Sequence, residues 1–238
     1  MSGKRDNFDP NELAKFEALA SRWWDKNGEF GALHDINPLR LEWIKKHIDF
    51  PNMRVVDIGC GGGILTESMS LSGADVTGID LAEAPLAVAR LHQHESNTKI
   101  DYRNISAEDL ALEETNSFDI VTCLEVLEHV PDPSSIIKSC ANLVKPGGHL
   151  FFSTINRNFK AFLLAIVGAE YILKLLPSGT HEYQKFLKPS ELGLWARKSG
   201  LTLEDSIGMQ YNPVSKKYSL ENSLDVNYLM YFRREKSF

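Results

Sequence analysis

An apolar run that ends in an acid and then breaks into glycines constrains the fold of this chain most. Residues Met53 to Ile58 are typical of a buried parallel strand, and four glycines stand among residues 59 to 63. A glycine cluster in that place makes the tight turn that leads into a helix, which we expect from Ile64 to Ser72. The pattern predicts an α/β sheet with a nucleotide-like ligand bound at this turn.

The spacing of the glycines argues against a nicotinamide dinucleotide. The fingerprint G-x-G-x-x-G fails, because its third glycine position falls on Ile64 when counted from Gly59 and on Thr66 when counted from Gly61. What remains is D-x-G-x-G-x-G, which begins at Asp57. An acid there would repel a pyrophosphate, whereas it could receive the cationic amino-acid end of S-adenosylmethionine (SAM).

A second acid stands at the end of the next apolar strand. This strand, Asp75 to Ile79, leads to Asp80 at about the twenty-residue interval where a carboxylate meets ribose hydroxyls. A glycine cluster alone would also fit a plain turn. Together with Asp57 and Asp80, it predicts a SAM site.

Composition limits the class of protein. The chain has 238 residues, 43% hydrophobic and 24% charged, which suits one domain over 11–238 after a flexible N-terminus at 1–10. A net charge of −6 gives no general reason to expect nucleic acid. Three cysteines without CxxC spacing suit a reducing cytosol. Because no stretch is long enough to span a membrane and the N-terminus resembles no signal peptide, we expect a cytoplasmic protein.

Strand and helix patterns alternate through most of the chain. An amphipathic helix is expected over Asn11 to Trp24, either as a lid over a site or as a helix simply docked on the sheet. A loop at 33–40 should start a helix near Pro38 that runs to about Ile48. A polar turn is expected at 106–109. Further helices are expected to begin at Pro85 and Pro189, and further strands at Lys99–Arg103, Phe118–Cys123, His149–Thr154, Leu201–Tyr211 and Val226–Arg233. These strands and the first two make a mostly parallel, doubly wound sheet of seven strands, with a polar hairpin-like segment between the last two.

Two further side chains are candidates for contact with SAM. Arg40 lies just ahead of the glycine strand and could reach the carboxylate of the donor as a bidentate partner, or it could be a surface arginine. Glu108 follows the third strand, where an acid could meet the adenine amino group. Asp109 competes for that role, and either acid could simply begin a helix.

A cluster of acids and a histidine follows the fourth strand. If Glu125, Glu128 and His129 occupy one helical turn, they point to the same side. His129 could then be the general base that removes a proton from a substrate hydroxyl, oriented by a neighbouring carboxylate. Alternatively, the three side chains could hold Mg²⁺ or another hard divalent cation, or they could only tie the loop.

The segment Phe159 to Leu176 is almost wholly apolar, but Lys160, Glu170 and Lys174 interrupt it. It is too short and too charged to cross a bilayer. It could lie in a membrane interface, cover the substrate as a hydrophobic lid, or form a core helix.

Several motifs resemble class I SAM-dependent methyltransferases in general, namely Asp57 to Gly63, Glu125 to Pro133 and Leu143 to Gly148. Others are more particular and resemble the family of ubiquinone-biosynthesis O-methyltransferases, most closely its bacterial form. They are Lys15 to Glu17, Ser21 to Asp25, Leu33-His34, Ile36 to Arg40, Phe152 to Asn158, Val167 to Leu173, Gly179 to His181 and Val226 to Tyr228. The resemblance covers nearly the whole chain after about residue 10.

This resemblance implies a Rossmann-like methyltransferase fold with an N-terminal helical cap and a helical insertion at about 158–178. It also implies that Arg40, Gly59, Asp80 and Leu124 bind the methyl donor, and Gly61 and Leu81 beside them complete the predicted donor site. In related members the positions of Glu125, Glu128 and His129 are associated with a divalent cation.

The family methylates ring hydroxyls of two polyprenylated phenol intermediates, so the expected substrate is a prenylated phenol or catechol. Segment 159–176 matches an insertion linked to membrane lipid. The implied location is therefore the cytoplasmic side of the inner membrane, peripherally bound, with other ubiquinone-biosynthesis proteins as candidate partners and no nucleic acid. Two alternatives share the cofactor motifs: a methyltransferase of another small phenol or carboxylate, and a non-catalytic SAM-binding scaffold.

Overall fold

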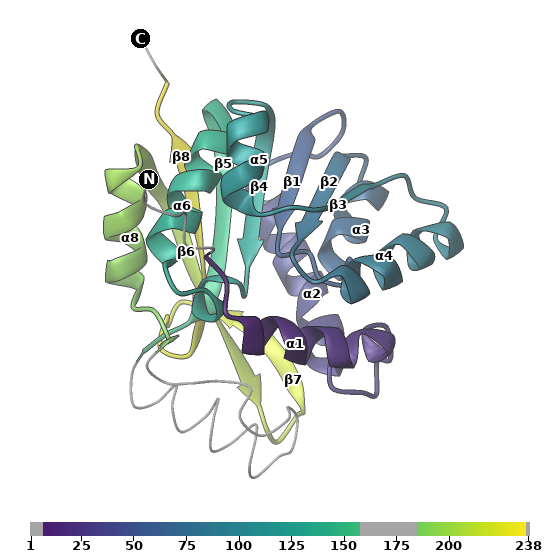
Figure 1. Cartoon of the computed structure of the whole chain (residues 1–238). Coiled ribbons are helices and arrows are strands. Elements are labelled where there is room, and N and C mark those ends of the chain that lie inside the picture. The colour runs from purple at the N-terminus through teal and green to yellow at the C-terminus, as the bar shows by residue number, and fades with distance from the viewer. Residues whose placement is uncertain (1–6, 158–184, 237–238) are drawn as a thin grey trace.

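A computed structural model describes residues 7–157 and 185–236 of the chain, which form an eight-stranded sheet with helices on both faces (Figure 1). The strands are β1 (Arg54–Ile58), β2 (Asp75–Asp80), β3 (Asp101–Asn104), β4 (Phe118–Leu124), β5 (Val144–Ile155), β6 (Leu201–Asn212), β7 (Lys217–Glu221) and β8 (Asn227–Arg234). The helices are α1 (Pro10–Leu19), α2 (Gly31–Lys45), α3 (Ile64–Leu71), α4 (Glu83–Glu95), α5 (Ala107–Glu113), α6 (Pro133–Leu143) and α8 (Pro189–Lys198), with short 3₁₀ turns η1 (Ala20–Arg22) and η2 (Leu127–His129).

The strand order is β3-β2-β1-β4-β5-β8-β6-β7. Strands β1 to β5 are parallel, and the chain moves outward from β1 in one direction through β2 and β3 and in the other through β4 and β5. The change of direction between β1 and β4 is a topological switch point. In doubly wound sheets, ligands bind outside the carboxyl ends of the strands at such a point. The glycine turn after β1 and the acidic cluster after β4 both lie there.

The sheet ends in antiparallel strands, and here the expected count of seven strands was one too low. The segment predicted as a polar hairpin contains β7, which pairs with β6 and forms the edge of the sheet. Only Tyr218 and Leu220 in β7 are apolar, and they alternate with polar residues at strand spacing and pack against the cluster that contains α2. Two apolar residues are too weak a signal to identify a strand from sequence.

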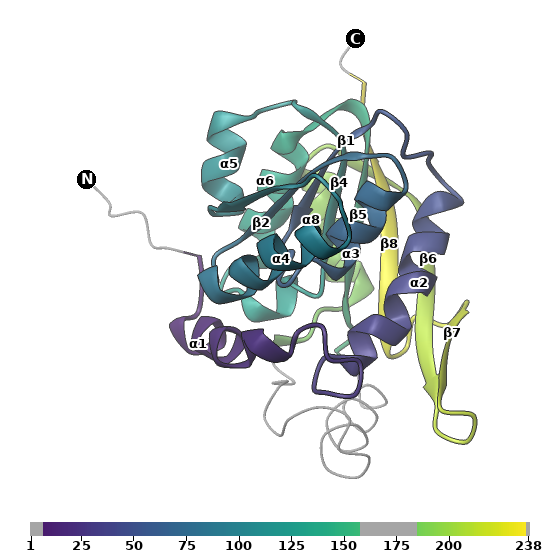
Figure 2. The ribbon, with the colours of Figure 1, turned by 90° about the vertical axis from the view of Figure 1, so that its right-hand side faces the viewer.

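Helices lie on both faces of the sheet (Figure 2), and an apolar core fills the space between the sheet and the helices on each face. One core joins the sheet to α5, α6 and α8, with Leu110, Ile137 and Leu192 fully buried. The other joins it to α2, α3 and α4, with Ile44, Met69 and Leu86 fully buried. Since the central parallel strands β1 and β4 are buried on both sides, they read as nearly continuous apolar runs, as the sequence indicated.

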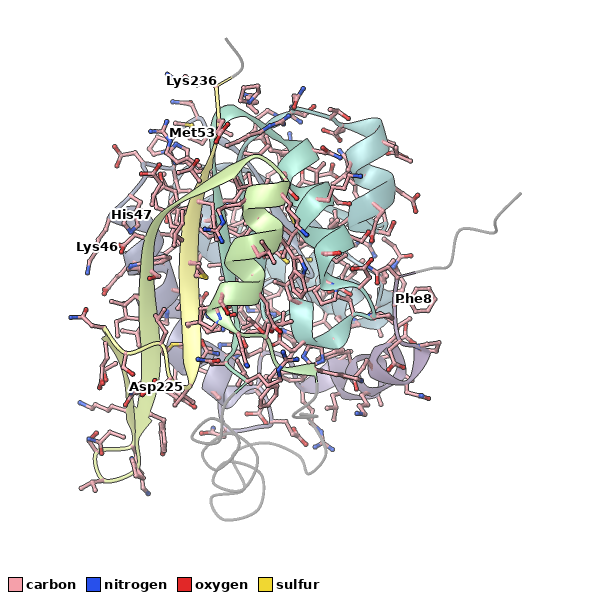
Figure 3. The ribbon with its side chains drawn as sticks, turned by 90° about the vertical axis from the view of Figure 1, so that its left-hand side faces the viewer. Phe8, Lys46, His47, Met53, Asp225 and Lys236 are labelled. Carbon is pink, nitrogen blue, oxygen red and sulfur yellow. The ribbon has the colours of Figure 1, made fainter. Side chains whose placement is uncertain are left out.

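Figure 3 shows α8 in front of the sheet and labels Asp225 in the segment that leads into β8. The predicted helix from Pro189 to Lys198 is thereby confirmed. The helix predicted from Pro85 is α4, which begins two residues earlier, at Glu83. The third strand, which was expected at Lys99–Arg103, is β3 and runs from Asp101 to Asn104.

The N-terminal region differs from expectation in two places. The first helix ends at Leu19 and continues as the 3₁₀ turn η1 rather than as one helix to Trp24. Helix α2 begins at Gly31, so Pro38 lies inside it rather than at its start. A proline inside a helix removes one backbone hydrogen bond. Burial of Ile36 against the core stabilises the helix on the N-terminal side of that proline, which local sequence signals do not report.

In Figures 1 and 2, α1 lies across one end of the sheet. Among residues 7–157 and 185–236, no helix is long and apolar enough to cross a membrane. The predicted insertion at 158–178 and the apolar segment 159–176 lie outside the described residues. Arg157, the last described residue before them, pairs with Glu191 of α8.

Candidate functional site

A cavity of about 640 Å³ opens at the carboxyl ends of β1, β2 and β4, beneath α1. It is large enough for a nucleoside-sized ligand together with a second small molecule. All eleven residues that the sequence suggested for donor binding, catalysis or metal binding line it: Arg40, Asp57, Gly59, Gly61, Asp80, Leu81, Glu108, Leu124, Glu125, Glu128 and His129. The structure therefore brings the predicted residues together, whereas the role of each residue stays a prediction.

The glycine turn is shaped by the protein's own side chains. Gly59 and Gly61 have φ of +70° and +52°, a region that residues with a Cβ rarely adopt. A Cβ on Gly59 would lie 2.3 Å from Val126, and one on Gly61 would lie 2.1 Å from the ring of Trp23. Glycine is thus needed both for the backbone conformation and for the close approach of Trp23.

Replacing Gly61 by alanine should destabilise the protein by about 2–4 kcal/mol, because the left-handed backbone and the displaced Trp23 ring both cost free energy. Gly200→Ala is a matched control. Gly200 has φ of +76°, but a Cβ there would meet nothing within 4 Å, so only the backbone cost of about 1–2 kcal/mol remains. Chemical denaturation measures both changes. Equal losses would show that Trp23 does not pack tightly on the turn.

Asp57 at the end of β1 is buried, and both its carboxylate oxygens are engaged. Oδ1 accepts a hydrogen bond from the Thr122 hydroxyl and Oδ2 one from the Thr66 hydroxyl, each at 2.7 Å. Burial raises the pKa of Asp57 to about 6, although the two threonines lower it. The carboxylate lines the cavity, but its first contacts are with the neighbouring strand and helix.

Asp80 at the end of β2 holds the glycine turn in place. Its Oδ2 accepts from the backbone amide of Gly61 at 2.9 Å, and its Oδ1 accepts from the amide of Ala82 at 2.8 Å. Burial raises the pKa of Asp80, while these amides lower it. Because an ionised carboxylate has about four acceptor positions, Asp80 can also accept from a ligand. Leu81 follows, and its carbonyl accepts from Asn104 at 2.9 Å.

Glu108 lies in the first turn of α5, because Ser106 caps that helix through the amide of Asp109 at 3.0 Å. The segment expected as a polar turn is therefore a helix start, and the Asp109 carboxylate accepts from Ser106. Glu108 lines the cavity and accepts from Asn7 and Ser135 at 2.9 Å each. Of the two acids considered for adenine, only Glu108 lines the cavity.

Arg40 projects from α2 into the cavity and pairs with Glu125, with 2.5 Å between Nη2 and Oε1. Its side chain is 7% exposed, so the reading of Arg40 as a surface arginine is wrong. The buried Nε has no hydrogen-bond partner among the described residues. A buried donor without an acceptor is costly. Together with the free acceptor positions of Asp80, this atom fits a ligand that carries both a carboxylate and ribose hydroxyls, as SAM does.

Glu125 and Glu128 are not arranged on one α-helical turn as the sequence suggested. Glu125 has φ of +57°, and only residues 127 to 129 form a 3₁₀ turn. Glu125 accepts from Ser153 at 2.7 Å and from Asn227 at 3.1 Å, while Glu128 accepts from Thr154 at 2.8 Å. The backbone conformation at Glu125 could not be read from its residue type, because glutamate rarely adopts positive φ.

The two glutamates differ in protonation. Burial raises the pKa of Glu125, but Arg40, Ser153, Asn227 and Glu128 outweigh it, so the pKa falls below its ordinary value. Burial and the charge of Glu125 raise the pKa of Glu128 to about 8. Glu125 is therefore the glutamate that favours the ionised form, and Glu128 the one that more readily takes up a proton.

His129 contacts two side chains of α1. Its Nδ1 lies 2.9 Å from Oε2 of Glu12, and the edge of its ring packs against Phe16 with 5.2 Å between ring centroids. Burial lowers the pKa of His129, but Glu12, Glu128 and Glu125 raise it, and the net direction is upward. The hydrogen bond from His129 lowers the pKa of Glu12 to about 2.

The three side chains suggested as cation ligands do not form a ready site. Glu125 is paired with Arg40, Glu128 with Thr154, and His129 with Glu12. In the described part of the chain, no group of three or more histidine, cysteine, aspartate or glutamate side chains is placed to hold a metal ion.

Sequence reasoning missed several residues that line the cavity. Trp23 lines the cavity over the glycine turn. Its neighbour Trp24 does not line the cavity but donates from Nε1 to the Gly62 carbonyl at 2.9 Å. The aromatic density of the segment that ends in these two tryptophans was the sequence signal for a lid, which was one of its two expected roles. Glu12, Asn227 and Tyr218 also line the cavity, and they come from elements far from the motif in sequence. Because Leu13 and Phe16 line it as well, α1 is a cover over the site rather than a helix only docked on the sheet.

Fold and site together define a methyltransferase of the SAM-dependent class, and comparisons with known proteins agree. Residues 32–206 match a family model described as a methyltransferase domain. Magnesium protoporphyrin IX methyltransferase from Synechocystis with bound S-adenosylhomocysteine has the same fold, with a TM-score of 0.67 and 18% identity over 94% of this chain and all of that chain. A SAM-dependent methyltransferase from Thermotoga maritima gives a TM-score of 0.64 and 19% identity over 94% of this chain and 99% of its own.

Proteins similar in sequence identify the family within the SAM-dependent methyltransferases. Proteins named ubiquinone biosynthesis O-methyltransferase from Pseudomonas putida and Pseudomonas aeruginosa are each 61% identical over 229 residues, which is 96% of this chain and 99% of theirs. The chain belongs to the ubiquinone biosynthesis O-methyltransferase family. The family resemblance seen in the sequence is thereby confirmed, as is the Rossmann-like methyltransferase fold.

Proposed function

We propose that this protein transfers the methyl group of SAM to a ring hydroxyl of polyprenylated phenol and catechol intermediates, in both O-methylation steps of ubiquinone biosynthesis. The observation that carries this proposal is that Asp80 and His129 open onto one cavity. The Asp80 carboxylate can accept hydrogen bonds from the ribose of the donor, and the His129 imidazole can accept the proton of a substrate hydroxyl. When bound, SAM supplies the methyl group, and its sulfur is the leaving group.

Asp80 and Arg40 hold the two ends of the donor in this proposal. Asp80 accepts from the ribose hydroxyls with its remaining acceptor positions, while Arg40 donates from Nε to the carboxylate of the donor. Gly59 and Gly61 let the backbone approach the donor, and Leu81, Leu124 and Glu108 complete the walls. These contacts align the donor for in-line attack by the substrate oxygen.

His129 removes the proton from the attacking hydroxyl. Since Nδ1 is engaged by Glu12, Nε2 is the ring nitrogen available to the substrate. As the oxygen forms its bond to the methyl carbon, the carbon–sulfur bond breaks and the hydroxyl proton passes to Nε2. Glu125, with its lowered pKa, and Glu128, with its raised pKa, line the same cavity.

Methyl transfer from labelled SAM to a short-chain prenylated catechol tests the proposed function. Labelled ether product supports it. Transfer to a soluble phenol or carboxylate but not to the prenylated catechol would assign another substrate, and SAM binding without any turnover would make the protein a scaffold.

A divalent cation at Glu125, Glu128 and His129 is the alternative way to promote ionisation of the hydroxyl. A cation there would compete with protonation of Glu128, whose pKa is raised, and would have to open the Arg40–Glu125 pair. Assays of chelator-treated enzyme with and without added Mg²⁺ separate the two. Unchanged turnover leaves His129 as the base alone, whereas a strict requirement would mean that an ion enters the cluster.

We also propose that segment 159–176 binds the surface of the inner membrane. The proposed prenylated substrate is lipid-soluble whereas SAM is water-soluble, so the enzyme has to meet its substrate at that surface. Replacing Leu163, Leu164 and Ile166 by serine should reduce co-sedimentation with anionic liposomes at least about tenfold, because buried methylenes contribute about 0.8 kcal/mol each. SAM affinity measured by calorimetry should not change. Unaltered sedimentation would contradict membrane contact by this segment.

A further inference from the structure

The one buried residue of helix α1 is a glutamate. Glu12 is 6% exposed, whereas every other residue of the helix is half-buried or exposed. A helix that covers a site only by packing would bury apolar side chains instead. A buried carboxylate must be hydrogen-bonded or paired with a cation, and the groups that it contacts indicate its role.

Glu12 divides its two oxygens between different partners. Oε2 faces Nδ1 of His129 at 2.9 Å, and Oε1 accepts from Lys15 at 3.0 Å and lies 3.7 Å from Nζ of Lys185. One turn further along α1, Phe16 packs edge-on against the imidazole, with an angle of 84° between the ring planes. Helix α1 therefore fixes the ring of His129 through two contacts of different kinds.

Other contacts of the N-terminal segment fasten it without Glu12. Asn7 donates to the carbonyl of Asp132 at 2.9 Å and accepts from its amide at 2.8 Å. Asp9 pairs with Lys185 at 3.3 Å, and Trp24 is bound to the Gly62 carbonyl. The position of α1 does not depend on the Glu12–His129 contact alone, so that contact is available for another role.

We propose that Glu12 is a positioning residue for His129, an inference that rests on the proposed function. An ionised carboxylate can only accept, so Nδ1 of His129 carries the proton and Nε2 presents its lone pair to the substrate hydroxyl. When the hydroxyl proton moves to Nε2, the imidazolium formed lies against the carboxylate of Glu12. The proton then leaves to solvent after the methyl group has been transferred. A catalytic arrangement of base and orienting acid is thus assembled from two segments 117 residues apart.

Glu12→Gln tests this role, because glutamine keeps the size and polarity of the side chain but lacks the charge. We expect kcat with a prenylated catechol to fall at least about tenfold. The KM for the catechol, the Kd for SAM and the Tm should each stay close to wild type, since the other contacts hold α1. Glu12→Asp restores the carboxylate and should recover part of kcat. Glu17→Gln, on the exposed side of the same helix, is the control and should behave as wild type.

Wild-type kcat in the Gln variant would overturn the inference, as would equal kcat in the Gln and Asp variants. A parallel loss of kcat, SAM affinity and Tm would also overturn it, because Glu12 would then only tie α1 to the loop. In each case turnover by the wild-type enzyme would leave the proposed function standing. Absence of wild-type turnover with every prenylated phenol would refute the proposed function itself. That result comes from the wild-type enzyme alone, so it is distinct from a failure of the inference about Glu12.

Discussion

Asp80→Ala should weaken the binding of SAM by about 100- to 10,000-fold. Two hydrogen bonds from ribose hydroxyls to an ionised carboxylate contribute about 1.5–3 kcal/mol each, and each 1.4 kcal/mol is a factor of ten in Kd. The same substitution removes the acceptor that holds the amide of Gly61 at 2.9 Å, so the glycine turn also loses its anchor. Isothermal titration calorimetry with SAM and S-adenosylhomocysteine measures the change directly.

Asp75→Ala is the matched control for this loss. Asp75 begins the same strand at its opposite end and is exposed, so its removal tests the effect of one fewer acid on β2 without touching the cavity. Asp80→Asn gives a second comparison, because asparagine retains an acceptor for one amide but not the charge. Wild-type affinity in Asp80→Ala would place the ribose elsewhere in the cavity.

The features that sequence reasoning could predict are local ones. A buried strand, the glycines after it and the acid at the end of β2 follow each other within thirty residues or so, and their spacing carries the chemistry of the ligand. Backbone conformation at Gly61 and the position of Asp80 beside it are consequences of that short segment. For the same reason, the parallel half of the sheet was expected correctly, since each βα unit is a local pattern.

The features that could not be predicted depend on contacts between distant segments. Glu12 reads as an ordinary acid in the first turn of a helix until the fold brings His129 to it. The start of α2 before Pro38 depends on burial of Ile36 in the core, not on a local signal. The separation of Glu125 from His129 depends on a positive φ that glutamate rarely adopts. The sequence spacing of Glu125, Glu128 and His129 predicted that the three side chains share one face of a helical turn. The backbone at Glu125 is not helical, so that prediction was wrong.

His129→Gln should lower kcat by about 10²–10⁴-fold, the usual contribution of a positioned general base. Glutamine retains a polar side chain of similar length, so SAM affinity and the KM for the catechol should change little. Glu12 would lose its hydrogen-bond partner, and this buried carboxylate should make the variant somewhat less stable. His94→Gln, on the exposed side of α4, is the control for the loss of an imidazole and should retain wild-type kcat.

The pH dependence of the same variant distinguishes a base from a side chain that only shapes the cavity. Because the pKa of His129 is raised, wild-type kcat/KM should increase with pH through a value above the ordinary 6.5 of histidine, as the ring loses its proton and becomes able to accept one. In His129→Gln that limb should disappear, and the remaining activity should rise with hydroxide as the phenol itself ionises. A loss of kcat that leaves the limb in place would assign the proton transfer to another group, with the raised pKa of Glu128 as the next candidate.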